Sequence, residues 1–412
     1  MFQIRKKNLL EYWGILWLVL FSGSLYFQVL RIRLTMIIVA ITIFAMMLGG
    51  WKIKKNNGNL FIIYTIILLL NTLFTFSNGV DINDFILLLL RFLFCIIVQS
   101  NMSDLRFKKV FIDIMYCEAI LSLVCFLYID VFAIGLLPMQ HFTQGPVNGY
   151  YLTPYYTIGW KNIPLFHRNA GWFLEPGAHQ IFLNFALLFL LANGSELELS
   201  KRQYRFRAII LIVAVLTTMS TTGYMCLFVI MASIMFIRIN KNDSSEKQFI
   251  RNLRYLAIVG LLVLVAVEST THIIEYKFAG MYTGQSSAAT RYNDTLVGYQ
   301  IALTEPFVGH GIFNTSTVEL LKEYNVVNIS NGLASFLIGA GLILGVGYLF
   351  LIYKGIKRSF INAGTVFHVL VFVFFLLCVN SEGGALGILL YLTYMFDWKQ
   401  EEWKNELEML DR

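Results

Sequence analysis

Charged residues are scarce in this sequence. Asp, Glu, Lys and Arg make up 14% of its 412 residues, whereas hydrophobic residues make up 57%. Soluble domains are about one quarter charged, so this composition argues against a soluble protein. The hydrophobic residues form many runs of about 17–22 residues, the length that a helix needs to cross a bilayer. We therefore predict an all-α, polytopic transmembrane protein rather than a β-barrel, whose sequence would show short alternating segments.

Motifs that bind metals or nucleotides are also lacking. The five cysteines stand singly inside hydrophobic runs, without the spacing of a metal site or of a disulfide framework. The short loops contain no nucleotide-binding glycine motif. We expect no cofactor and no metal. The net charge of +7 reflects basic residues that fall mostly on one side of the predicted membrane, which indicates topology rather than a nucleic-acid partner.

The hydrophobic runs divide the chain into about twelve predicted spans. The first run lacks a small-residue cleavage site, so we expect it to be retained as a span. The span at 207–219 is short and is followed by STTG at 220–223, so a re-entrant pair is an alternative to two full crossings. The predicted spans cover residues 12–30, 34–50, 60–76, 84–99, 110–131, 176–193, 207–219, 222–238, 255–272, 331–353, 361–378 and 383–396.

Lysine and arginine are distributed unevenly between the two sides of the predicted membrane. With the amino terminus in the cytoplasm, 24 of the 32 Lys and Arg residues fall in inner segments and 7 in outer segments. Short cytoplasmic loops of membrane proteins carry an excess of these residues. We therefore expect both termini to be cytoplasmic.

Proline is rare and is concentrated in two long outer loops, between spans 5–6 and 9–10. All six prolines lie in these loops or at their edges. Proline fixes φ, and long loops in a compact protein usually have a function, so we expect any chemistry to face outward. The loops divide the chain into an amino-terminal five-span bundle (1–137), outer loop 1 (138–175), central spans 6–9 (176–272), outer loop 2 (273–330), and three carboxy-terminal spans with a cytoplasmic tail (331–412).

The end of outer loop 1 reads RNAGWFLEPGAHQ and leads directly into an apolar run. Pro176 suits the first turn of a helix, which would put Glu175 at or near the N-cap. In one interpretation, Glu175 complements the helix dipole and Arg168 pairs with it. In the other, Arg168 grips a phosphate with its planar guanidinium and Glu175 takes a proton from a sugar hydroxyl. The residues alone leave both interpretations open.

Outer loop 2 and an aromatic run in outer loop 1 also have two interpretations each. Arg291 lies in a segment, 290–304, that looks helical and is stopped by Pro306. His310 follows in a glycine-flanked turn. Arg291 and His310 are each either a solvated surface residue or part of a site. The run NGYYLTPYYTIGW at 148–160 is either an interfacial aromatic belt or a platform on which sugar rings stack.

Ionisable residues inside the predicted spans need partners, because they are costly at that depth. Arg91 and Glu118 lie at similar depths in neighbouring spans, so we predict a hydrogen bond or bridge between them, with Asp113 as a competing partner. A group of glycines near the start of the span at 331–353 is interpreted as allowing close helix packing rather than binding a ligand. These glycines are Gly339, Gly341, Gly345 and Gly347.

Four motifs follow one another in the second half of the chain. RNAGWFLEPGA at 168–178 matches R-x-x-G-x-F-x-E-P, and STTG at 220–223 matches S-x-S/T-G/R. Arg291 precedes EPFVGHG at 305–311, which matches P-x-x-G-x-G, and SNGLASFLIGAG at 330–341 is an Asn-led start of a span. In this order the motifs resemble bacterial O-antigen and capsular polysaccharide polymerases of the Wzy type, within the O-antigen ligase and polymerase superfamily.

The resemblance implies a GT-C-like glycosyltransferase of cell-envelope polysaccharide biosynthesis in the bacterial cytoplasmic membrane. Its substrate would be oligosaccharide repeat units on undecaprenyl pyrophosphate, with the growing glycan passing from its carrier to a new carrier-linked unit. Membrane lipid, a flippase and a chain-length regulator are the further partners implied. The residues carried over as catalytic are Arg168, Glu175, Arg291 and His310, and those carried over as substrate-binding are Gly171, Trp172, His179, Tyr292 and Asn331.

Within this resemblance, the two arginines would stabilise the leaving pyrophosphate. Glu175 is the first candidate for the base and His310 the second. We expect Arg291 and His310 to approach the same cavity as Arg168 and Glu175.

Three alternatives to a polymerase are open for the same sequence. Ligases that transfer the glycan to another acceptor commonly have His-Asn where this chain has Ser330-Asn331, which favours a polymerase. A flippase or exporter of lipid-linked glycan would carry its key charges near the midplane, often with internal repeats. Here the distinctive polar residues cluster in outer loops and no repeat is visible. A membrane scaffold would not need such clustering.

Overall fold

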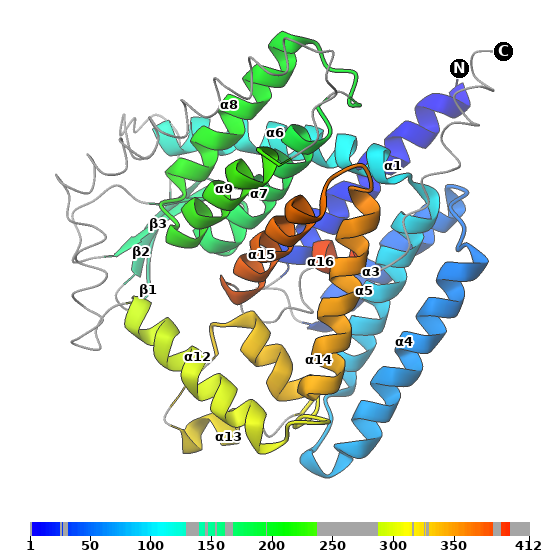
Figure 1. The fold of residues 1–412 in the computed structure, drawn as a ribbon, viewed down its shortest axis with the longest axis vertical. Helices are drawn as coiled ribbons and strands as arrows, with labels where there is room; N and C mark the ends of the chain where they lie inside the picture. Colours follow the sequence, from blue (N-terminus) through cyan, green and yellow to red (C-terminus); the bar gives the residue numbers. More distant parts are fainter. Residues whose placement is uncertain are drawn as a thin grey trace. The chain divides into compact units, whose positions relative to one another are not determined.

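The computed structural model of the chain describes residues 2–24, 27, 32–128, 140–144, 147–152, 155–160, 168–194, 196–236, 287–314, 317–324, 326, 329–381 and 389–395. Helices dominate these residues, as the sequence predicts (Figure 1). The helices of ten or more residues are α1 (Phe2–Gly23), α3 (Ile32–Leu48), α4 (Lys55–Phe74), α5 (Ile82–Asn101), α6 (Asp104–Phe126), α7 (Pro176–Ala192), α8 (Lys201–Thr217), α9 (Thr221–Ile234), α12 (Ser287–Thr304), α14 (Gly332–Ser359) and α15 (Thr365–Ser381). Two shorter ones are α13 (Thr317–Glu323) and α16 (Leu389–Thr393).

The observed helices overlap the predicted spans along the chain, apart from the predicted span at 255–272, which lies outside the described residues. Among the described helices, α4, α5 and α14 are long and apolar enough to cross a membrane. The helices α3, α7, α9 and α15 are apolar but shorter. The structure thus supports a helical membrane protein, and the number of twelve spans stays a prediction.

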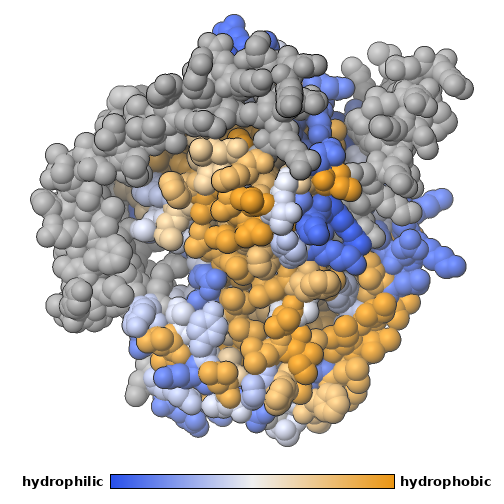
Figure 2. All heavy atoms as spheres, viewed as in Figure 1, coloured by the Kyte–Doolittle hydropathy of each residue, from blue (hydrophilic) through white to orange (hydrophobic). Residues whose placement is uncertain are grey.

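Large hydrophobic side chains are exposed along several of these helices. On α14, Ile343, Val346 and Phe350 are largely exposed, and so is Phe74 on α4. Figure 2 shows hydrophobic side chains covering much of the described surface on one face. Soluble monomers rarely expose large apolar patches, so this surface is suited to lipid.

The segment predicted as outer loop 1 contains a four-stranded antiparallel sheet that the sequence analysis did not predict. Its strands follow chain order: β1 (Gln140–Gln144), β2 (Val147–Leu152), β3 (Tyr155–Trp160) and β4 (Arg168–Gly171). The aromatic run at 148–160 supplies β2 and β3, which pair from Val147 with Trp160 to Leu152 with Tyr155. Strand β4 joins through the pairing of Ile158 with Arg168. Tyr, Trp, Ile and Thr favour strands, so the composition of this run agrees with the pairing.

The chain forms two compact units. Unit 1 comprises Met1–Thr65, Asn83–Cys226 and Leu386–Arg412, and unit 2 comprises Ile66–Ile82 and Leu227–Ala385. Unit 1 thus includes β4 and the start of α7, whereas unit 2 includes α12, α13 and α14. These units follow packing and do not coincide with the five segments drawn from the loops.

Helix α7 forms the centre of unit 1. Its residues from Pro176 to Leu191 are buried, as expected for a helix that is apolar all round. Phe182 stacks on Phe111 of α6, with ring centroids 6.4 Å apart. Phe189 stacks on Tyr394, with centroids 6.2 Å apart. The start of α7 is therefore held by a packed core.

Polar side chains also join the helices of unit 1, and they correct one prediction. Asp113 of α6 accepts hydrogen bonds from Arg207 of α8 and from Tyr12 of α1. Glu118 contacts His179 of α7 at 2.8 Å. The other Glu118 oxygen, Oε1, and Arg91 Nε are buried without a hydrogen-bond partner among the described residues, so the predicted bridge between Arg91 and Glu118 is wrong. Similar depth in neighbouring spans did not determine which helix face each residue occupies.

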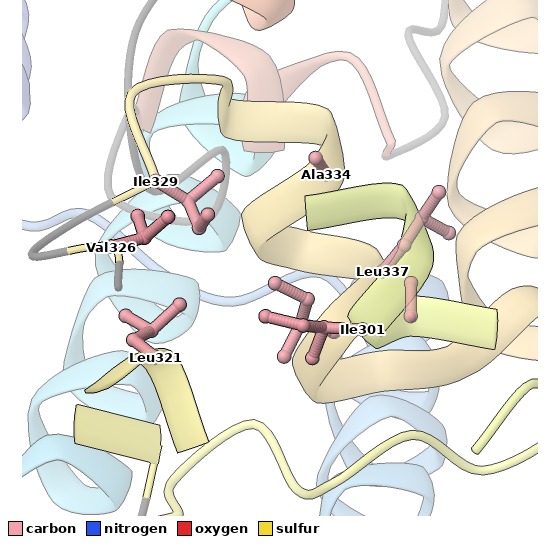
Figure 3. Packing of buried hydrophobic residues seen from close by; sticks show 8 residues of the cluster. Ile301, Leu321, Val326, Ile329, Ala334 and Leu337 are labelled. Carbon is pink, nitrogen blue, oxygen red and sulfur yellow. The ribbon is translucent and has the colours of Figure 1, made fainter. Parts of the chain in front are cut away.

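Unit 2 has its own hydrophobic core between α12, α13 and α14. Figure 3 shows side chains from these helices and from the segment before α14 gathered in this core. Its buried residues are Ile301, Ala302, Leu321, Val326, Ile329, Ala334, Leu337 and Ile338. This core holds α12 against the first part of α14.

Candidate functional site

The RNAGWFLEPGA motif lies at the junction of β4 and α7. Pro176 is in the first turn of α7 and Glu175 is the N-cap residue, which confirms the prediction for both. The N-cap backbone is extended, but the Glu175 side chain makes no capping hydrogen bond. The first N–H groups of a helix lack intrahelical partners and carry a partial positive charge. The helix start thus retains its capacity to bind an anion, with a carboxylate beside it.

Arg168 is fixed by the end of α8. Its Nε donates a hydrogen bond to the carbonyl oxygen of Thr218 at 3.1 Å. Thr218 is the C-cap residue of α8, where carbonyl groups carry partial negative charge. The next residue, Asn169, donates from Nδ2 to the hydroxyl of Thr217 at 3.0 Å. The helix ends thus complement the charges of this motif, because the C-cap of α8 contacts Arg168 and Glu175 is the N-cap of α7.

The STTG motif packs against the same region. Asn184 of α7 donates from Nδ2 to the carbonyl oxygen of Gly223 at 3.2 Å. A Cβ atom at Gly223 would come within 3.0 Å of the Cβ of Gln180, so the two helices approach closely here. The structure therefore places residues that flank each motif against the other motif: Thr218 contacts Arg168, and Asn184 contacts Gly223.

The turn between α8 and α9 lies slightly earlier than predicted. Met219 has a positive φ of 47°, and α9 already begins at Thr221. The hydroxyl of Ser220 accepts a hydrogen bond from the backbone N–H of Gly223 at 3.3 Å. Ser220 therefore acts as the cap of α9, and the rest of the STTG motif forms its first turn.

Three residues predicted to bind substrate follow Arg168 in the same region. Trp172 is partly exposed and stacks on Tyr155 of β3, with centroids 6.1 Å apart. Gly171 has a positive φ of 57°. The His179 side chain is fully buried between Glu118 and the backbone of Asn169.

Burial raises the pKa of the Tyr155 phenol, and the Glu118 carboxylate raises it further. That phenol therefore stays neutral at physiological pH.

The other candidates lie in unit 2. Arg291 and Tyr292 are on α12, which ends at Thr304, two residues before Pro306, and this confirms the predicted helix and its stop. Tyr292 is exposed, and the side chain of Arg291 lies outside the described part of the structure. The imidazole Nε2 of His310 lies 2.8 Å from the hydroxyl of Thr304. His310 is therefore tied to the end of α12.

The turn at 305–311 inserts into a break in α14. Gly341 has φ 70° and ψ 176°, a non-helical conformation inside this helix. The backbone N–H groups of His310 and Gly311 donate to the carbonyl oxygens of Ile338 at 2.8 Å and Gly339 at 3.0 Å. Gly339 and Gly341 are therefore positions of close approach, but to a turn rather than to the predicted helix, and the prediction is wrong for Gly347, where nothing lies within 4 Å of an added Cβ atom.

Asn331 is the N-cap residue of α14. Its Oδ1 accepts from the backbone N–H of Ala334 at 3.0 Å, and its Nδ2 donates to the hydroxyl of Thr295 at 3.2 Å. Its Oδ1 thus caps α14, and its Nδ2 joins α12 to α14. The role in substrate binding drawn from the resemblance stays a prediction.

The candidate residues fall into two groups. Arg168, Gly171, Trp172, Glu175 and His179 belong to unit 1, and Arg291, Tyr292, His310 and Asn331 belong to unit 2. Each group is described within its own unit, and the expectation that they share a cavity stays a prediction. Within the described residues, no cluster of three or more His, Cys, Asp or Glu side chains could hold a metal ion.

Sequence reasoning missed two polar residues of unit 1 that support this site. Asn169 stands inside the quoted motif, and Glu118 was assigned to another partner. The available signal was the presence of a carboxylate, Glu118, in one predicted span and of a histidine, His179, in the first turn of another. Ionisable groups at that depth are usually paired.

Comparison with protein-family models and with curated protein sequences gives no match to this chain.

Proposed function

We propose that this protein is a membrane glycosyltransferase that polymerises oligosaccharide repeat units carried on undecaprenyl pyrophosphate, at the outer face of the bacterial cytoplasmic membrane. One observation carries the proposal. Each of the two motifs that fall in unit 1 contacts residues that flank the other: Arg168 is hydrogen-bonded to Thr218, two residues before the STTG motif, and Gly223 of that motif is hydrogen-bonded to Asn184 of α7. The neighbouring helix start, with Glu175 as its N-cap, adds a carboxylate and a positive dipole end.

The proposed reaction needs no nucleotide, because the donor is already activated by pyrophosphate. The bond between the donor sugar C1 and the pyrophosphate oxygen breaks, and C1 bonds to a hydroxyl oxygen of the acceptor unit. The pyrophosphate leaves with the bonding electrons, and the hydroxyl proton passes to Glu175 as the base. Arg168 stabilises the negative charge that develops on the leaving group, and Arg291 is proposed to act in the same way.

The nearest second candidate is a ligase that carries out the same transfer to a different acceptor. Ser330 at the position where ligases commonly have histidine favours the polymerase. A flippase or exporter is the third candidate, and the polar groups at the β4–α7 junction favour an enzyme over it.

Lipid-linked glycan profiling in a deletion strain tests the proposal. A polymerase predicts that the deletion strain accumulates single repeat units on the carrier and that the intact gene restores long chains. Long chains that remain on the carrier in the deletion strain would instead indicate a ligase. Repeat units trapped on the cytoplasmic side would indicate a flippase, and either result would overturn the proposal.

A further inference from the structure

A fully buried pair of polar side chains lies behind the candidate arginine. The Glu118 and His179 side chains have no exposed surface, and His179 Nε2 lies 2.8 Å from Glu118 Oε2. The other ring nitrogen of His179, Nδ1, lies 3.3 Å from the backbone carbonyl oxygen of Asn169. The imidazole therefore bridges α6 to β4, one residue away from Arg168.

The proton positions in this bridge follow from its partners. A carbonyl oxygen can only accept, so Nδ1 of His179 carries a hydrogen. Nε2 faces a carboxyl group, so one proton lies between His179 and Glu118 in either protonation state of the pair.

Gly171 is shaped by the same pair. A Cβ atom at Gly171 would collide with Oε1 of Glu118 and would lie 3.0 Å from Cε1 of His179. The positive φ of Gly171 also turns the chain at the end of β4. The glycine in R-x-x-G is therefore required in this structure for two reasons, backbone conformation and contact with the pair.

Asn169 completes the attachment of β4. Its Oδ1 accepts from the backbone N–H of Gly171 at 3.0 Å. Its Nδ2 donates to the hydroxyls of Thr217 at 3.0 Å and Ser122 at 3.3 Å. The contacts of Asn169, the residue next to Arg168, thus fix β4 to α6, α7 and α8.

We infer that Glu118 and His179 are positioning residues that hold β4 so that Arg168 is presented at the start of α7 in one fixed orientation. This inference rests on the proposed function of Arg168. Because neither side chain has exposed surface, neither contacts substrate in this role, which replaces the substrate-binding role that the resemblance gives to His179. Their role is to preorganise the arginine, since small displacements of a binding group are costly for catalysis.

The test compares Glu118→Ala with Glu118→Gln in purified protein. In E118Q the new side-chain amide can donate to His179 Nε2 while His179 Nδ1 still donates to Asn169, so this variant preserves the bridge. E118A removes it. A matched control is Glu11→Ala, because Glu11 is also nearly buried and pairs with Arg106 at 2.6 Å in the same unit, away from β4.

Two measurements are made on each variant. The first is the mobility of a spin label at Leu174→Cys, an exposed position between β4 and α7, in protein with Cys117 and Cys125 replaced by alanine. The second is the rate of glycan lengthening with lipid-linked repeat units extracted from the deletion strain. For E118A we expect a more mobile label and a kcat lowered by about 10- to 100-fold, with KM nearly unchanged. For E118Q and E11A we expect the wild-type label spectrum and a kcat within about two-fold of wild type.

The two ideas fail separately. If wild-type protein does not lengthen lipid-linked glycan, the proposed function falls, and the label spectra still decide whether the pair holds β4. A label in E118A that is as immobile as in wild type would overturn the inference. So would E118A with a mobile label but wild-type kcat, because the pair would then be structural only.

Discussion

Arg168 Nε donates a hydrogen bond to the carbonyl oxygen of Thr218 at 3.1 Å, although fifty residues separate them in the chain. The acceptor is a backbone group at the end of α8, so this contact depends on where that helix ends and not on the Thr218 side chain. Lysine cannot reproduce the arrangement, because its compact ammonium group cannot donate to this carbonyl while a planar fork of further N–H groups faces another acceptor. The site therefore distinguishes arginine from lysine, although both side chains carry the same charge.

Arg168→Ala should abolish long-chain glycan, and Arg168→Lys should reduce it strongly, because lysine keeps the charge but not the planar fork. The measurement is polymer length in a complemented deletion strain, with membrane protein level as the reference. Arg106→Lys is a matched control, since Arg106 also donates from Nε, at 2.6 Å to Glu11. It should leave polymer length unchanged. Wild-type polymer from both Arg168 variants would remove the pyrophosphate interpretation.

Glu175→Gln should abolish polymer while leaving the protein in the membrane. The Glu175 side chain makes no capping hydrogen bond, so the substitution removes only its interaction with the helix dipole, about 0.3–1 kcal/mol. Glu198→Gln is the control, because Glu198 is exposed and pairs with Lys109 at 3.4 Å. Polymer of normal length from Glu175→Gln would exclude Glu175 as the base and leave it a role at the helix start alone.

Local sequence rules predicted the elements that depend on neighbouring residues. Pro176 fixed the start of α7 and made Glu175 its N-cap, and the stop before Pro306 ended α12. These outcomes follow from the missing N–H and fixed φ of proline. The contacts of Arg168 with Thr218 and of Asn184 with Gly223 were not predicted, since no local rule relates residues so far apart in the chain.

The features that sequence reasoning missed depend on long-range contacts. Strand β4 pairs with β3 by backbone hydrogen bonds across a gap in sequence, and no periodicity marks so short a strand. The partner of Glu118 proved to be His179, because the rotation of each helix about its axis decides which residues meet. The break in α14 at Gly341 could not be predicted from the local sequence, because it depends on the turn at 305–311 that occupies it. Glycine in the sequence indicated close approach without identifying the partner.

Gly171→Ala should destabilise the protein. Alanine is disfavoured at a positive φ by about 1–2 kcal/mol, and its Cβ would also collide with the Glu118 carboxylate. The measurement is the thermal unfolding midpoint of purified protein in detergent. Gly58→Ala is the control in the same unit, since the nearest atom to its Cβ would be Ile53 Cγ2 at 3.6 Å. Equal midpoints for the two variants would contradict the close approach of Glu118 to β4.

The two predicted sides of the membrane can be distinguished by single cysteines at exposed positions. Glu198 and Tyr292 are both exposed and lie in segments expected to be cytoplasmic and outer, respectively. An impermeant thiol reagent applied to intact cells should therefore label Tyr292→Cys but not Glu198→Cys, and permeabilised cells should allow both to react. Protein with only its native cysteines provides the background. Labelling of Glu198→Cys alone in intact cells would show that the predicted orientation in the membrane is reversed.

Gly341→Ala should disrupt the break in α14. Residues other than glycine rarely adopt φ 70° with ψ 176°, and such strain costs about 1–3 kcal/mol. The added Cβ would also lie 2.5 Å from the carbonyl oxygen of Phe307 and 2.6 Å from the backbone nitrogen of Gly309, so the turn carrying His310 would have to move. We expect a lower unfolding midpoint together with loss of polymer. Gly347→Ala, in the same helix with open space around its Cβ, should be neutral or slightly stabilising, because alanine favours a helix over glycine by about 0.5–1 kcal/mol. If Gly341→Ala matched Gly347→Ala in both measurements, the inserted turn would not be what holds α14 in its broken form.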